Sequence, residues 1–204
     1  MYRNCGVDRA SQPAFNMDMA VTLKRRRFTV DEYHRMAEVR ILAPGERVEL
    51  IDGQILEMTP IGARHIRCVI FLTEAFVRRL DGRALVSSQN ALRLNRWSEP
   101  EPDLVLLRPP LARYGKDIPT PAHALLVVEV ADSSHHRDRA IKLPRYAAAG
   151  VPEAWIVDLD GECVEVCRDL VGGRYRERRR VPRGETVAPE TFPDVTLEVA
   201  DILG

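Results

Sequence analysis

The chain has 204 residues, 45% of them hydrophobic, and its 30 basic and 30 acidic side chains cancel to a formal net charge of zero. This length suffices for one domain with a sizeable core. A neutral balance provides no global field for a polyanion, so any such site must be local. No apolar run reaches the roughly 18 residues of a bilayer span, and no signal-peptide pattern opens the chain, so we expect no membrane partner and a cytoplasmic location.

The beginning of the chain mixes polar and apolar residues without any period. We therefore expect a mobile tail over 1–24 and a single domain over 25–204. Met17 and Met19 are alternative starts of translation. The basic run Lys24–Arg27 is typical of a solvated terminus, and a nucleic-acid contact is the alternative.

Two local patterns follow. Thr29 and Glu32 have the spacing of a capping box, which predicts a helix to about Arg40. Residues 47–58 predict a β-hairpin around Asp52-Gly53, a dipeptide suited to a type I′ turn. Glu49 in its first strand is either a solvent-facing residue or a functional one.

A second helix is predicted from Gly62 to Leu80, where apolar residues recur at helical spacing. His65 lies on its apolar stripe and is either a satisfied, half-buried residue or a ligand. The four cysteines, with no CxxC spacing, predict neither a metal centre nor a disulfide framework.

Three strand candidates come next: Ala84–Leu94, Asp103–Leu107 and Ala124–Ala131. Prolines and a glycine break the segment between the last two, so these strands most simply pair antiparallel. Asp103 and Glu129 then lie at the same end of the sheet. Two carboxylates in an apolar setting are best neutralised by a shared cation, and hard oxygen ligands suit Mg²⁺ or Mn²⁺.

The pattern then changes to strand, helix and strand. Asp132-Ser133-Ser134 can cap a helix from about Arg137 to Ala149, and a further strand follows over 152–158. This order predicts a right-handed parallel crossover and a mixed α/β sheet. Lys142 in the helix either forms a surface ion pair with Asp138 or assists chemistry beside a metal.

The chain beyond residue 158 is predicted to be peripheral. Segments 163–169 and 174–181 form a polar hairpin around Gly172-Gly173. Its second strand, rich in arginine, is typical of an exposed sheet edge protected by charge, and phosphate contact is the alternative.

A family resemblance rests on these same residues. The order Pro102-Asp103 and then Val128-Glu129-Val130 resembles the PD-(D/E)XK signature of the restriction-endonuclease-like nucleases. The longer run 129–158, with Glu49-Leu50-Ile51-Asp52-Gly53 upstream, resembles that superfamily's "Putative restriction endonuclease" family over residues 28–203. The resemblance implies a mixed central sheet flanked by helices, with an N-terminal β-hairpin and a C-terminal β-rich extension.

The resemblance also implies a site. Asp103, Glu129 and Glu49 would bind Mg²⁺ or Mn²⁺. The common signature has a lysine where this chain has Ala131, and Lys142 on the following helix is the matching residue. Gln89 is a candidate for the rim of the site.

The implied activity is that of a hydrolase, a metal-dependent endonuclease that cleaves DNA phosphodiester bonds. The alternative is an inactive nuclease-like fold that serves as a nucleic-acid-binding or assembly module. By analogy with enzymes that cut both strands, a homodimer is expected.

Overall fold

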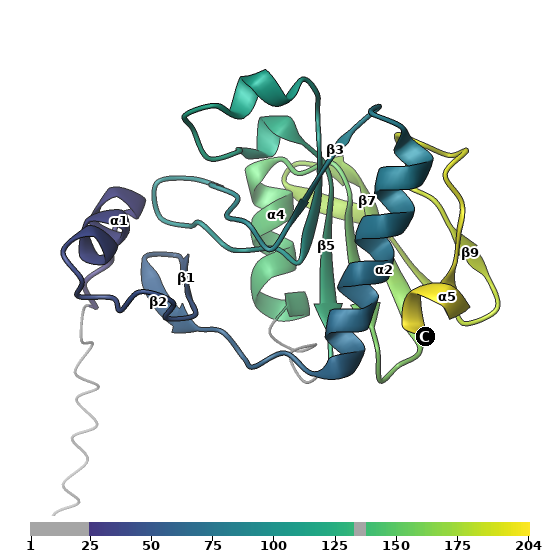
Figure 1. Ribbon diagram of the computed structural model, residues 1–204, viewed down its shortest axis with the longest axis horizontal. Helices are drawn as coiled ribbons and strands as arrows, with labels where there is room; N and C mark the ends of the chain where they lie inside the picture. Colours follow the sequence, from purple (N-terminus) through teal and green to yellow (C-terminus); the bar gives the residue numbers. More distant parts are fainter. Residues whose placement is uncertain (1–24, 133–137) are drawn as a thin grey trace, which may run out of the picture.

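The structure is a computed structural model and describes residues 25–132 and 138–204. The predicted tail and the cap residues Ser133 and Ser134 lie outside the described residues. Figure 1 shows a central sheet with helices on both sides, and a small hairpin and helix α1 (Val30–Glu38) at one side of the molecule.

Six strands form the central sheet in the order β3-β4-β5-β6-β7-β8. Their bounds are β3 (Leu85–Ser88), β4 (Leu104–Leu107), β5 (Ala124–Ala131), β6 (Ala154–Asp158), β7 (Cys163–Val171) and β8 (Arg174–Pro182). Strand β5 pairs antiparallel with β4 and parallel with β6, as predicted. The all-apolar sequence of β5 apart from Glu129 fits a strand that is buried on both faces.

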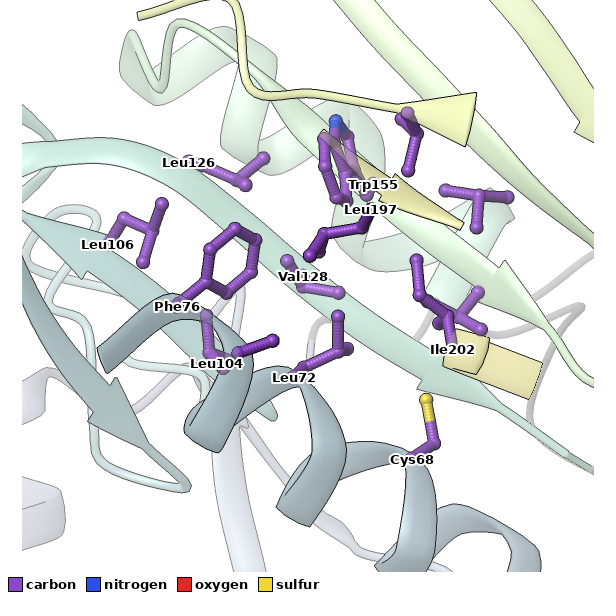
Figure 2. Packing of buried hydrophobic residues seen from close by; sticks show 14 of the residues in the cluster. Cys68, Leu72, Phe76, Leu104, Leu106, Leu126, Val128, Trp155, Leu197 and Ile202 are labelled. Atoms are coloured by element: carbon purple, nitrogen blue, oxygen red, sulfur yellow. The ribbon is translucent and has the colours of Figure 1, made fainter. Parts of the chain in front are cut away.

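Helices cover the two faces of this sheet. The side chains of α2 (Ala63–Leu80) and α5 (Val199–Leu203) pack on the face formed by residues such as Val128 and Trp155, together with β10 (Leu197–Glu198) (Figure 2). The alternate residues, including Ala154 and Ile156, pack against α4 (Leu143–Ala149) on the opposite face. The period of two along each strand therefore divides the core into two layers.

The predicted N-terminal hairpin is confirmed as β1 (Val48–Ile51) and β2 (Gln54–Glu57). Asp52 and Gly53 both have positive φ angles, as a type I′ turn requires. Helix α1 begins at the predicted capping box of Thr29 and Glu32. The Tyr33 hydroxyl donates a hydrogen bond to the Val48 carbonyl, 2.9 Å away, and so ties α1 to the hairpin.

Two expectations about the central region need correction. Strand β3 ends at Ser88 and not at Leu94, because Gln89 adopts a left-handed backbone conformation and the chain leaves the sheet. The helix after β5 begins with a π-helical turn, η3 (Asp138–Lys142), and becomes α-helical only at Leu143. Pro144 follows at once and has no N–H for the α-helical pattern.

The C-terminal hairpin was predicted to be peripheral, and this was wrong. Strands β7 and β8 continue the central sheet beyond β6, and the first five residues of β7 are buried. Of these two strands, β8 lies at an edge of the sheet and is largely exposed, and β9 (Thr186–Val187) with β10 makes a separate two-stranded sheet. Short 3₁₀ segments, η1 (Leu111–Tyr114) and η2 (Pro121–His123), connect β4 to β5.

The sequence predicts neither a membrane span nor a disulfide framework, and both expectations concern residues 25–132 and 138–204 of the structure. None of the helices there combines the length and apolar character needed to cross a bilayer. Cys68, Cys163 and Cys167 are buried, and none of these three described cysteines forms a disulfide. Burial raises the pKa of the Cys68 thiol to about 12, so this thiol stays protonated at neutral pH.

The packing of α2 generates a stability prediction. Leu72 is completely buried, whereas Ile70 on the same helix is 61% exposed. Leu72→Ala should lower the free energy of unfolding by about 2–5 kcal/mol, because it leaves a cavity between α2 and the sheet. Ile70→Ala, the matched control, should change it by less than about 0.5 kcal/mol. Urea denaturation measures both, and equal losses would contradict this packing.

Candidate active site

The sheet brings Asp103 and Glu129 together. Leu104 pairs with Val128 in the antiparallel ladder of β4 and β5, and continuing this register by one residue places Asp103 opposite Glu129. The backbone N–H of Val130 donates a hydrogen bond of 2.8 Å to Asp103 Oδ2. The two acids therefore lie at the same end of adjacent strands, as the sequence predicted.

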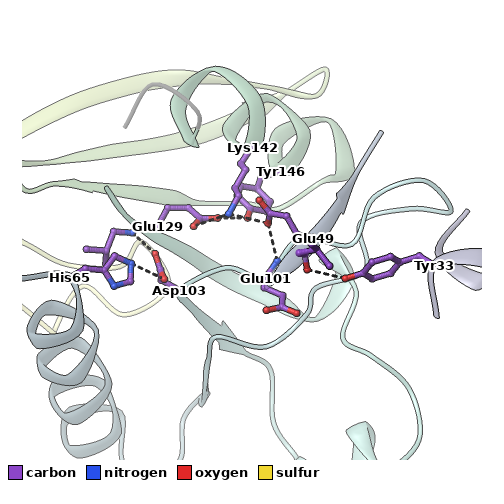
Figure 3. Close-up of polar contacts among 10 residues, drawn as sticks. Tyr33, Glu49, His65, Glu101, Asp103, Glu129, Lys142 and Tyr146 are labelled. Carbon is purple, nitrogen blue, oxygen red and sulfur yellow. Dashed lines mark hydrogen bonds and ion pairs between the residues drawn. The ribbon is translucent and has the colours of Figure 1, made fainter. Parts of the chain in front are cut away.

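Glu129 is the single acid in β5 and is only 4% exposed. Its carboxylate accepts a hydrogen bond from the Tyr146 hydroxyl and lies 3.4 Å from the Lys142 ammonium (Figure 3). Both partners come from the helical segment that covers this face of the sheet. An ionised carboxylate at this depth requires such partners, because burial without them would cost several kcal/mol.

Glu49 reaches the same place from the hairpin. It is 2% exposed, so its solvent-facing interpretation is wrong. Its Oε2 atom lies 3.1 Å from the Lys142 ammonium and accepts a 3.4 Å hydrogen bond from the backbone N–H of Glu101. Strand β1 is buried along its whole length, which explains why simple alternation did not apply to it.

Lys142 lies between the two glutamates (Figure 3) and is 6% exposed. Lys142 is therefore not a surface residue, and the side chain of Asp138, its partner in the ion-pair interpretation, lies outside the described residues. The end of the π-helical turn directs the Lys142 side chain towards the acidic end of the sheet. One ammonium thus compensates two buried carboxylates from strands that are far apart in sequence.

His65 completes the group from the first turn of α2. Its Nε2 atom lies 3.0 Å from Asp103 Oδ1, and the ring is buried. Its Nδ1 atom has no hydrogen-bond partner among the described residues. His65 is therefore a buried residue, and one of its ring nitrogens contacts an acid of the site. Its position on the helix did not predict this contact.

These side chains surround a cavity of about 50 Å³, which has space for a few water molecules. Its lining consists of Arg47, Glu49, Met58, Thr59, Ile61, His65, Glu101, Asp103, Glu129 and Lys142. An adjoining cavity of about 390 Å³ shares Glu101 and Asp103 and also contains Gln89, the residue expected at the rim. A larger groove of about 600 Å³ beside β3 contains none of these acids.

Glu101 is the site residue that the sequence analysis missed. It lies two residues before Asp103 and lines both cavities. Burial raises the pKa of its carboxyl group, and the Glu49 carboxylate raises it further, whereas Arg47 and Lys142 act in the opposite direction. Its proximity in sequence to Asp103 was the available signal.

The donors are hard carboxylate oxygens, which suit Mg²⁺ or Mn²⁺. Within residues 25–132 and 138–204, however, no three acidic, histidine or cysteine side chains converge on a common metal position. In this conformation Glu49 and Glu129 contact the Lys142 ammonium, and Asp103 contacts His65 and the β5 backbone. The chemistry of the donors suits a divalent cation, whereas their arrangement among the described residues does not assemble a set of three ligands.

The arrangement of the sheet and helices is a nuclease-like α/β fold. It matches the crystal structure of "a putative nuclease belonging to DUF820 from Anabaena variabilis" with a TM-score of 0.66 and 14% sequence identity, over 86% of this chain and 97% of that one. The chain belongs to the Uma2 family, described as "Putative restriction endonuclease", whose model matches residues 30–200. No curated protein matches it significantly.

The buried ion pairs predict a strong effect of Lys142 on stability. Lys142→Met should lower the free energy of unfolding by about 3–5 kcal/mol, because Glu49 and Glu129 lose their shared cation. Adding Glu49→Gln to this variant should restore part of the loss. Lys116→Met, at an exposed lysine, is the control and should have little effect. Chemical denaturation measures the free energy of unfolding, and an equal loss in Lys142→Met and Lys116→Met would contradict the buried ion pairs of Lys142.

The raised pKa of Glu101 predicts a pH-dependent effect on stability. Its folded-state pKa lies above the ordinary value of 4.5, so the folded state disfavours the ionised carboxylate. The contribution of Glu101 to stability therefore falls as the pH rises from below 4.5 through its folded-state pKa. Glu101→Gln should raise the melting temperature at pH 7, and the difference should disappear near pH 4. A gain that persists unchanged at pH 4 would contradict this cause.

Proposed function

We propose that the protein is a metal-dependent endonuclease that hydrolyses phosphodiester bonds of DNA. The observation that carries the proposal is the meeting of Glu49, Glu129 and Lys142, from three separate elements, beside Asp103. The family match gives independent support. A lysine with a purely structural role would not need to contact two acids beside a cavity.

We assign Asp103, Glu129 and Glu49 as the residues that would hold Mg²⁺ or Mn²⁺. A bound divalent cation would activate a water molecule and offset the charge of the phosphate in the transition state. The protein's own contribution is to fix the carboxylates. The Tyr146 hydroxyl orients Glu129, and His65 together with the Val130 N–H orients Asp103.

In this proposal Lys142 interacts with the attacking water and with the phosphate. Its ammonium can donate a hydrogen bond to the attacking water or to a phosphate oxygen, and its positive charge can offset negative charge that develops on the phosphate. Ala131, at the position of the signature lysine, is fully buried against Leu143 and Ala147 of α4. A lysine on the helix that reaches back to the acids is consistent with that tightly packed position.

The alternative function, an inactive binding or assembly module, also has an observation in its favour. The Lys142 ammonium occupies the space between Glu49 and Glu129, so the protein's own cation compensates the two acids that would bind metal. If this compensation is permanent, Mg²⁺ has no site there. Metal binding and cleavage therefore distinguish the two functions.

The proposal predicts the results of calorimetric titration with Mg²⁺ or Mn²⁺. Wild type should bind the metal, whereas Asp103→Asn and Glu129→Gln should weaken binding by at least about tenfold, since each removes an anionic ligand. Lys142→Gln should retain metal affinity within about tenfold but lower the rate of DNA cleavage by about 10²–10³. Asp117→Asn, at an exposed acid distant from these residues, is the control.

Each result has a contradicting counterpart. Equal metal affinity in wild type, Asp103→Asn and Glu129→Gln would show that these acids are not the metal ligands. A folded wild type that binds neither metal would favour the inactive module. Full cleavage by Lys142→Gln would refute the role of the displaced lysine and leave the carboxylates standing.

A further inference from the structure

An arginine–tryptophan cluster, formed by Arg27, Arg96 and Trp97, lies outside the candidate active site. The guanidinium carbons of Arg27 and Arg96 lie 4.7 and 4.6 Å from the centre of the Trp97 ring. Such cation–π contacts hold a cation in place while leaving its N–H groups able to bind an anion. The indole thus holds two positive charges against its ring.

The cluster is attached rigidly to the hairpin that carries Glu49. The Trp97 carbonyl accepts a 2.7 Å hydrogen bond from the Gly53 N–H, and Arg27 Nε donates one of 2.7 Å to the Asp52 carbonyl. The approach is close, because a Cβ atom at Gly53 would lie 2.6 Å from the Cβ of Arg27. Three residue steps of extended strand, about 10 Å, lead from Glu49 to Asp52.

The surface around the cluster has an excess of positive charge. Arg25, Arg26, Arg27 and Arg96 are all exposed. Arg26 pairs with Glu32, and Arg145 on α4 pairs with Asp52 at the hairpin tip. Arg25 and Arg96 form no ion pair within the described part of the chain, and their charges are available to a ligand.

We propose that Arg25 and the arginine–tryptophan cluster bind the sugar–phosphate backbone of the DNA next to the bond that is cut. The inference rests on the proposed function, because it assumes that DNA lies across the acidic site. Guanidinium groups suit phosphate oxygens. The Trp97 ring already carries two guanidinium groups, so the cluster presents cations and not an open face for base stacking.

Placement distinguishes this surface from the other arginine-rich region, strand β8. Asp52, which Arg27 of the cluster contacts, lies about 10 Å along the hairpin from Glu49, close to three base-pair steps of DNA. Strand β8 forms the far edge of the sheet, three strands from β5. The exposed Arg176 also lies beside the β7–β8 turn, at the end of the strands opposite to Glu129.

The test measures DNA binding apart from cleavage. A labelled 20-base-pair duplex and, separately, one of its single strands are titrated with the full chain carrying Glu129→Gln. EDTA is present, and each titration is repeated at several salt concentrations. Arg25→Gln and Arg96→Gln should each weaken duplex binding and reduce the slope of log affinity against log salt by about one, because each removes one phosphate contact. The matched control, Arg176→Gln, should leave the slope unchanged.

The outcomes separate this surface from the proposed hydrolysis. Unchanged slopes in Arg25→Gln and Arg96→Gln, an equal loss in Arg176→Gln, or no salt-dependent binding of either DNA would overturn the surface. If wild type cuts DNA with Mg²⁺ while the slopes do not change, hydrolysis stands and the surface falls. If the slopes fall as expected but wild type never cuts, the surface stands and the hydrolytic function falls.

Discussion

One buried ammonium group joins the parts of this protein. Lys142 lies 3.1 Å from Glu49 and 3.4 Å from Glu129, and all three side chains are nearly inaccessible to solvent. Each charge would be costly at this depth alone, so their positions depend on one another. Because the charges belong to β1, β5 and the η3–α4 segment, the same contact fixes the hairpin and the helix against the sheet.

The hairpin needs this attachment because it is a two-stranded sheet of its own, and such pairs are marginally stable without support. Further contacts hold it from outside. Glu99, which His34 and Arg93 contact, lies in the loop before β4 and pairs with Leu50 of β1 in an isolated β-bridge. Burial and then the carboxylates of Glu101, Glu99 and Glu49 raise the pKa of Tyr33 to about 12, which keeps its hydroxyl a donor to the hairpin.

The sequence was sufficient where residue periodicity and position carried the information. The apolar run of β5, the broken segment before it and the strand–helix–strand order predicted the pairing that places Asp103 opposite Glu129. The direction of Lys142 was not predictable, because a π turn adds a residue to the helical repeat and alters the phase of the side chains. The position of β7 was missed for another reason: its polar partner β8 resembled a peripheral ribbon, although β7 itself is buried.

Charge explains why the remaining features occur together. The cavity between hairpin and sheet has four carboxyl groups in its lining, Glu49, Glu101, Asp103 and Glu129, but only Arg47 and Lys142 as permanently charged cations. The raised pKa of Glu101 is a consequence of burial and of this excess of acids. Such a cavity attracts cations and repels a phosphate backbone. Any polyanion that approaches it must therefore be held by positive charge fixed nearby, and the tip of the Glu49 hairpin has that charge in Arg27 and Arg96. In the proposed function, the acids that line the cavity and the arginines held against the hairpin tip reconcile a neutral chain with a polyanionic ligand.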